Sequence, residues 1–153
     1  MTTPDYDRDF FAWTQAQAAA LRQKDFAALD LEHLAEEIES VGKRDRRAVE
    51  SYLEVRLRHA LKWVYQPQRR SGSWRRSLTV TRQRLTRLLR DHHTLREELP
   101  GLIGSAYPDA RELAAGETGL PLHTFPEACP WTGDQVLAAD FPPIEGYPGP
   151  GSR

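Results

Sequence analysis

Cysteine and methionine are almost absent from this 153-residue chain, which contains one of each. A single cysteine, Cys129, cannot form an intramolecular disulfide and cannot supply a four-cysteine zinc site. No apolar run approaches the roughly 18 residues that cross a bilayer. The N-terminus has aspartates where an export signal would have a basic start and an apolar stretch. These absences predict a cytoplasmic protein with no export leader and no contact with a membrane.

Catalytic motifs are equally scarce. The chain has no glycine-rich phosphate loop, no G-x-S-x-G nucleophile elbow and no H-E-x-x-H zinc motif. Cys129 could act as a nucleophile or a haem ligand, but no neighbouring residue would obviously lower its pKa. A structural cysteine beside Trp131 is the favoured interpretation. The sequence therefore does not favour an enzyme, and it predicts no cofactor.

Charge is abundant and strongly segregated. Residues 1–42 carry three Lys or Arg against nine Asp or Glu, a net charge of −6. Residues 43–96 carry sixteen against four, a net +12, and residues 97–153 carry two against nine, a net −7. Either the acidic flanks fold back on the basic middle, or the basic middle binds an external polyanion. The nearly equal excesses favour internal compensation, and the alternative stays open.

Apolar residues recur at helical spacing along most of the chain. The spacing predicts helices over about 6–24, 30–42, 44–65, 73–90 and 95–117, with a short helix at 133–139. Pro100, Gly101 and Pro108 should segment the fifth helix, and Thr94 should open it with a T-x-x-E capping box. Ser73 is the expected cap of the fourth helix, and Thr132 with Gln135 that of the short one.

The second predicted helix carries an apolar stripe that is expected to pack inward, and Gly42 offers a C-terminal stop. This stripe comprises Leu31, Leu34, Ala35, Ile38 and Val41. Beyond Gly119 the prolines multiply, and Leu122, Phe125 and Trp131 are expected to tuck into the bundle. The predicted fold is all-α, a single-domain bundle of four to five main helices over residues 1–140. It has an extended Pro-rich C-terminal segment that ends in a loosely ordered tail, 141–153.

Several stretches follow a recognisable order. They are "YDRDFFAWTQAQAAALR" at 6–22, "LDLEHLAEEIESVG" at 29–42, "HALKWVYQP" at 59–67, "SWRRSLTVTRQRL" at 73–85, "AYPDARELAAGETGL" at 106–120 and "FPEACPW" at 125–131. Together they resemble the bacterial family catalogued as "domain of unknown function 29". The resemblance implies an all-helical domain and implies no activity. One departure is "HTL" at 93–95, where the family pattern has proline and then serine.

Glu37 is the carboxylate expected to turn inward, because it lies one turn from both Leu34 and Val41. A buried carboxylate needs a partner, since stranding it costs several kcal/mol. Arg82 is the predicted partner, with His59 and Lys62 as alternatives. A buried cluster of Glu37, Arg82 and His59 would most often be structural.

A metal site at His33, Glu37 and His59 is a weaker hypothesis. Helical bundles hold dinuclear metals with Glu-x-x-His pairs on facing helices, and this chain lacks the second pair. His33 is therefore interpreted first as a hydrogen-bonding residue near the start of its helix. The pair His92 and His93 is interpreted as part of an interhelical connection.

The arginine-rich segment 69–90 is the strongest functional feature of the sequence. Its candidate nucleic-acid-binding residues are Arg69, Arg70, Arg75, Arg76, Arg84 and Arg87, with Trp74 available for stacking. Such a surface would bind nucleic-acid backbones in a salt-dependent way, whereas the connection before the helix is too long for a helix-turn-helix. The alternative is a basic helix seated beside an acidic one.

The sequence leaves the function unknown and favours a protein-interaction or binding module. Its partner would be an unidentified protein or a second copy in a homo-oligomer. Nucleic-acid binding through residues 69–90 is the alternative, and a metal-dependent enzyme is the second alternative.

Overall fold

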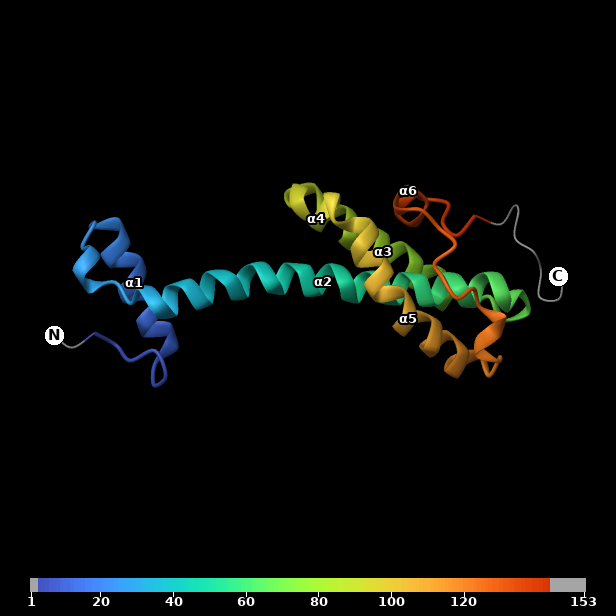
Figure 1. Cartoon of the computed structure of the whole chain (residues 1–153), viewed down its shortest axis with the longest axis horizontal. Coiled ribbons are helices and arrows are strands. Elements are labelled where there is room, and N and C mark those ends of the chain that lie inside the picture. The colour runs from blue at the N-terminus through green and yellow to red at the C-terminus, as the bar shows by residue number, and fades with distance from the viewer. Residues whose placement is uncertain (1–2, 144–153) are drawn as a thin grey trace. The chain divides into compact units, whose positions relative to one another are not determined.

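A computed structural model describes residues 3–143, and over this range the chain forms helices and turns without a β-strand (Figure 1). The helices are α1 (Phe10–Arg22), α2 (Leu31–Tyr65), α3 (Gly72–Asp91), α4 (His93–Glu97), α5 (Leu99–Thr118) and α6 (Gly133–Leu137). Short 3₁₀ turns lie at Phe26–Ala28, Pro67–Arg69 and Leu122–Thr124. The predicted all-α class is confirmed.

The chain divides into two compact units, Met1–Arg44 and Asp45–Arg153, and the boundary falls within α2. We call them the N-terminal unit and the C-terminal unit. The predicted tail, 141–153, lies mostly outside the described residues. Its first residue, Phe141, is buried, and its ring meets that of Trp131 edge-on with centroids 4.9 Å apart.

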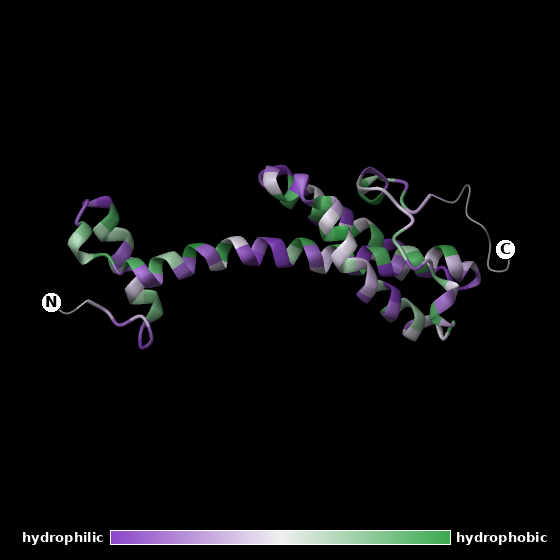
Figure 2. Cartoon of the chain, in the orientation of Figure 1, coloured by the Kyte–Doolittle hydropathy of each residue, from purple (hydrophilic) through white to green (hydrophobic). Residues whose placement is uncertain are grey.

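The core of the C-terminal unit is built mainly from α2, α3 and α5. Leu53, Leu57 and Leu61 of α2 are fully buried, as is Leu85 of α3. Helical spacing predicts six inward residues in α3; Leu78, Thr81, Leu85 and Leu89 are buried, whereas Trp74 and Leu88 are half-buried. Figure 2 shows the hydrophilic stretch in the middle of α2, where the sequence is rich in arginine.

Two segments after α5 close this core. Phe125 and Trp131 are buried as predicted, but the prediction for Leu122 is wrong, because its side chain is 42% exposed. The short helix α6 carries the predicted capping box, in which Thr132 and Gln135 bond reciprocally. The box expected at Thr94 does not form; α4 begins at His93, after His92, and no side chain caps it.

Gly42 does not end a helix, so the prediction of separate helices at 30–42 and 44–65 is wrong. The α-helix runs through it from Leu31 to Tyr65. A glycine stop needs a positive φ, which Gly119 has at 73° and Gly42 does not. A lone glycine costs a helix only about 1 kcal/mol, and the following Lys43 and Arg44 favour helix.

Two helix starts also differ from the prediction. α1 begins at Phe10 rather than near Tyr6, because the Asp9 side chain accepts a hydrogen bond from the Ala12 amide at 3.0 Å. α3 is capped by Ser71 rather than Ser73, and the Ser71 hydroxyl oxygen accepts from the Trp74 amide at 3.2 Å. The boundary is thus set by a capping side chain that lies after the predicted start of α1 and before the predicted cap of α3.

The apolar stripe of the second predicted helix is not the packing face of α2, and that prediction is wrong. Leu31, Ile38 and Val41 are 69%, 71% and 53% exposed. The residues of this segment that contact α1 and Tyr6 are instead polar, chiefly Asp30, His33 and Glu37. The first turns of α2 thus pack through polar residues together with the half-buried Leu34, and leave Leu31, Ile38 and Val41 of the apolar stripe exposed.

Replacing Gly42 by alanine should raise the helix content and the stability of the chain by about 0.5–1 kcal/mol. A Cβ at Gly42 would meet nothing within 4 Å. Urea denaturation followed by circular dichroism measures the change. Gly119→Ala is the matched control: it should destabilise, because its φ of 73° strains any residue with a Cβ. Destabilisation by Gly42→Ala would contradict the continuous helix.

Candidate functional site

Glu37 lies in a polar and aromatic cluster of the N-terminal unit. Its carboxylate accepts a short hydrogen bond, 2.5 Å, from the hydroxyl of Tyr6. This tyrosine, rather than an arginine, is the partner that the structure gives to Glu37. The ring of Tyr6 stacks on the imidazole of His33 with centroids 3.9 Å apart and meets Trp13 edge-on at 4.9 Å.

Asp30 links the two layers of this cluster. One carboxylate oxygen lies 2.7 Å from Nδ1 of His33 and accepts from the indole N–H of Trp13 at 3.2 Å. Its backbone amide donates to the buried side chain of Gln17 at 2.8 Å. The other carboxylate oxygen accepts from the His33 amide at 3.3 Å, so Asp30 caps the start of α2 and is also the centre of a hydrogen-bond network that fixes α1 against it.

The hydrogen bonds shift three pKa values in this cluster. The bond to Glu37, with burial and the charge of Glu37, raises the pKa of Tyr6 to about 12. The bond to Asp30 raises the pKa of His33, and the same contact with His33 lowers the pKa of Asp30. The contact between His33 and Asp30 thus favours the charged form of each, and the bond to Glu37 favours the protonated form of Tyr6.

Beside this cluster lies an exposed surface that we call the acidic apolar face. It comprises Phe10, Phe11, Leu21, Phe26, Leu31, Ile38 and Val41. Phe11, Leu31 and Ile38 are each at least 69% exposed. Glu32, Glu36 and Glu39 are exposed on the same stretch of α2. Large apolar side chains that are exposed among charged residues are typical of a protein-interaction surface.

The other members of the predicted polar cluster lie in the C-terminal unit. Nδ1 of His59 lies 2.8 Å from the backbone oxygen of Val55, and burial lowers the pKa of this histidine. Nε of Arg82 donates to the backbone oxygen of Leu137 at 3.2 Å. These partners give both residues structural roles, and the predicted grouping with Glu37 stays a prediction.

Sequence reasoning missed Arg56, which is 1% exposed. Its guanidinium donates to the backbone oxygens of Val136 at 2.5 Å, Ala138 at 3.0 Å and Leu78, and it lies 4.8 Å from the ring centre of Phe141. Burial, with a smaller effect of the Arg82 charge, lowers its pKa to about 10. The sequence pattern that could have identified it is its position on the apolar face that includes Val49 and Leu57. A charged side chain on such a face needs hydrogen-bond partners within the core.

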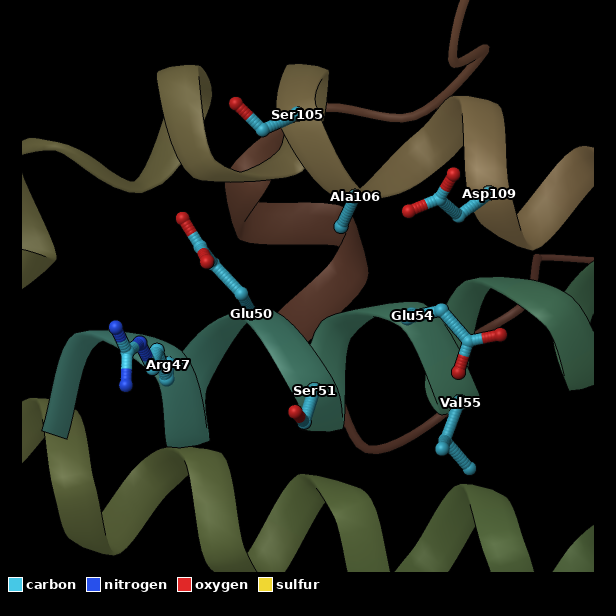
Figure 3. A pocket seen from close by; sticks show the side chains of 8 residues that line it. All are labelled: Arg47, Glu50, Ser51, Glu54, Val55, Ser105, Ala106 and Asp109. Carbon is cyan, nitrogen blue, oxygen red and sulfur yellow. The ribbon is translucent and has the colours of Figure 1, made fainter. Parts of the chain in front are cut away.

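An acidic hollow lies between α2 and α5, and Figure 3 shows Glu50, Glu54 and Asp109 around it with two serines. Oε1 of Glu54 lies 3.3 Å from Nε of Arg58 as an ion pair that lacks hydrogen-bond alignment. Burial, partly offset by Arg58, raises the pKa of Glu54. The ion pair with Arg58 accounts for the buried carboxylate of Glu54.

The basic charge of residues 43–96 is only partly compensated. On α2, Arg58 and Lys62 both contact Glu117 of α5, at 2.6 and 2.9 Å, and Arg46 contacts Glu98 at 2.5 Å. By contrast, within residues 3–143 none of the eight arginines from Arg69 to Arg90 lies within ion-pair distance of a carboxylate. Internal compensation therefore reaches α2 and not α3.

The predicted phosphate-binding residues fall into two groups. Arg70 and Arg75 lie over the ring of Trp63, with the guanidinium carbons 5.0 and 5.3 Å from its centre. Trp74, expected to stack on bases, is half-buried with the Lys62 amine 4.7 Å from its ring centre. Arg69, Arg76, Arg84 and Arg87 are exposed. Nucleic-acid binding by this segment stays a prediction.

The metal hypothesis gains no site from the structure. Among residues 3–143, no group of three or more His, Cys, Asp or Glu side chains is placed to hold a metal ion. His33 and Glu37 lie in the N-terminal unit, and His59 lies in the C-terminal unit. Cys129 is half-buried, its thiol contacts the Trp131 backbone oxygen at 3.6 Å, and burial raises its pKa.

These features define an all-α protein with an acidic N-terminal unit and an arginine-rich α3. The chain belongs to the family described as "Domain of unknown function DUF29", whose family model matches residues 6–142. The match confirms the resemblance found in the sequence, and it leaves the activity open. No curated protein and no solved structure matches the chain. Within the part that the structure describes, no helix combines the length and apolar character required to cross a membrane.

The His33–Asp30 pair should make the N-terminal unit sensitive to pH. Because the pKa of His33 is raised above 6.5, its stabilisation is complete below pH 6.5 and is lost as the pH rises through the raised value. Because the pKa of Asp30 is lowered from 3.8, its contribution is present above that pH and is lost as the pH falls through the lowered value.

An NMR titration of the imidazole protons measures the pKa of His33 directly. Asp30→Asn should lower it towards 6.5, whereas the titration of His59, in the C-terminal unit, serves as the internal control and should not change. An unchanged His33 titration in Asp30→Asn would show that the pair does not form.

Proposed function

We propose that this protein is an interaction module of the cytoplasm that pairs with a second copy of itself through the acidic apolar face. The observation that carries the proposal is the position of the exposed large hydrophobic side chains. Ten large hydrophobic side chains are exposed among the described residues, and seven of them lie between Phe10 and Val41. The C-terminal unit, which has more than twice as many residues, contributes the other three: Val80, Leu113 and Leu122.

Covering this face would be strongly favourable. Fully burying one Phe, Leu or Ile side chain contributes about 1.5–3 kcal/mol. Phe11, Leu31 and Ile38 are each largely exposed, so a partner that covered all three would gain several kcal/mol before the cost of association. The N-terminal unit cannot provide this cover itself, because its packing is already made through Tyr6, Trp13 and the polar side of α2.

Charge identifies the kind of surface that fits. Two acidic apolar faces would repel each other, since residues 1–42 carry a net charge of −6. A basic surface with an apolar floor is required instead. The chain carries such a surface on α3, so a second copy can supply it.

This complementary surface is the outer flank of α3, which comprises Arg76, Val80, Arg84 and Arg87 at helical spacing. A hollow of about 680 Å³ lies beside it, lined by Tyr52 and Val55 of α2 together with Arg76 and Val80. Its arginines have no carboxylate partner within residues 3–143. An apolar ridge edged with glutamates, taken from another copy, matches both its shape and its charge.

Ile38→Glu should weaken self-association by at least tenfold, because it places a charge in the apolar contact. Light scattering after size exclusion, from about 1 to 100 µM protein at about 50 mM salt, measures the monomer–dimer equilibrium. Leu113→Glu is the control, since Leu113 is an exposed apolar residue of α5, 45% exposed, that lies outside the proposed contact. A wild-type chain that remains monomeric at the highest concentration would overturn the proposal.

Charge reversal tests which surfaces meet. A variant with Glu36→Arg and Glu39→Arg, and another with Arg76→Glu and Arg87→Glu, should each lose affinity for itself. Mixing the two variants should restore dimers, because each then offers the other a complementary pair of surfaces. A wild-type dimer that both variants leave intact would place the interface elsewhere and would refute the assignment of these faces.

A further inference from the structure

Another hollow, of about 320 Å³, lies beside α3 on the flank opposite the proposed dimer contact. It is enclosed by α2, α3 and the segment that follows α6. Its charged and polar lining comprises Arg56, Trp63, Arg75, Thr79, Arg82 and Asp140. Three guanidinium groups therefore surround one small space that contains a single carboxylate.

Arg56 makes the potential of this hollow positive. Its charge is buried, and the three groups it contacts are neutral backbone oxygens, of Leu78, Val136 and Ala138. A buried cation in a protein normally has an anionic partner nearby, because Coulomb forces are strong where water is excluded. Within the described residues Arg56 has no carboxylate at ion-pair distance.

Arg75 and Arg82 supply the donors that a ligand can reach. They lie seven residues apart on α3 and therefore point to the same flank of the helix. Arg82 uses Nε for the backbone oxygen of Leu137, and its terminal nitrogens have no hydrogen bond to any of residues 3–143. Arg75 is exposed and lies over Trp63, which fixes its direction along the wall of the hollow.

Asp140 does not neutralise this set. It lines the hollow, but it lies beyond ion-pair distance of every described arginine. One carboxylate against three guanidinium groups leaves a net positive charge on the walls. The arrangement thus attracts an anion, and two planar guanidinium groups suit the tetrahedral oxygens of a phosphate group.

The ligand can be larger than a single phosphate. A neighbouring hollow of about 410 Å³ shares Trp63 and Arg75 with the hollow of about 320 Å³. It is also lined by Arg70, Ser71 and Gly72 at the start of α3. The two hollows together follow one side of α3 past a row of arginines. They offer room for a second phosphate or for the organic part of a phosphate ester.

We propose that the hollow lined by Arg56, Trp63, Arg75 and Arg82 is a binding site for the phosphate group of a phosphate ester. Arg75 and the terminal nitrogens of Arg82 contact the phosphate oxygens, and Arg56 provides a buried charge behind them. The phosphate can come from a small phosphorylated molecule or from the backbone of a single-stranded nucleic acid. This inference does not depend on self-association, because the two proposals use different flanks of α3.

The test uses the full chain and follows the indole N–H resonance of Trp63 by NMR, assigned with Trp63→Phe. Three probes are titrated separately: inorganic phosphate, adenosine 5′-monophosphate and an oligothymidine of about eight nucleotides. Site binding predicts that at least one probe shifts Trp63 with a Kd below about 1 mM at about 50 mM salt. Binding of the monophosphate and oligonucleotide at similar strength indicates a small-molecule site, whereas at least tenfold preference for the oligonucleotide indicates a nucleic-acid site.

Arg75→Gln should weaken binding of the preferred probe at least tenfold, and Arg84→Gln on the opposite flank should leave it unchanged. Arg75 is exposed and its guanidinium lies over the half-buried ring of Trp63, and circular dichroism checks that its replacement preserves the fold. Equal loss in both variants would show a diffuse basic surface and would overturn the site. No shift of Trp63 with any of the three probes would overturn it as well. Light scattering on Arg75→Gln should show unchanged self-association. The phosphate-binding proposal and the self-association proposal can therefore fail independently of each other.

Discussion

The buried guanidinium of Arg56 is the interaction on which the C-terminal unit depends. It joins α2 to the backbone of α3 at Leu78 and to the backbone around α6 at Val136 and Ala138. Over residues 119–143 the segment after α5 forms one α-helix of five residues and one 3₁₀ turn, so secondary structure pairs few of its backbone groups. Arg56 and Arg82 satisfy three consecutive carbonyl groups of this segment, from Val136 to Ala138, and hold it over the core. The same choice of neutral partners leaves positive charge beside the hollow proposed to bind phosphate.

The N-terminal unit is held together differently, by hydrogen bonds and ring contacts around Asp30 and Tyr6 rather than by a large apolar core. A compact unit of 44 residues has too much surface for its volume to bury many large side chains. It buries Trp13 and Gln17 and leaves Phe11, Leu31 and Ile38 exposed. Exposure of this kind is costly for an isolated protein, and this cost is the physical reason for proposing that another copy covers the face.

Charge segregation acquires a meaning once the residues are placed. The acidic residues of the C-terminal segment, notably Glu98 and Glu117, pair with cations of α2, so part of the compensation expected from the sequence is present. The arginines of α3 are left for other partners, and they divide by helix geometry into two flanks. The flank of Arg76, Arg84 and Arg87 suits the acidic apolar face of a second copy. The flank of Arg75 and Arg82 lines the hollow that is proposed to bind phosphate.

The sequence by itself determined the all-α class, the inward face of α3 and the capping box of α6, because spacing and caps are local properties of the chain. It also drew attention to Glu37, which does contact another side chain. Only the tertiary structure decided that Tyr6 is that partner, that Gly42 lies inside one long helix, and that the stripe of Leu31 and Ile38 is exposed. The reason is that periodicity identifies an apolar face but not what covers it. Whether such a face is core or surface depends on neighbours that are distant in the sequence or belong to another molecule.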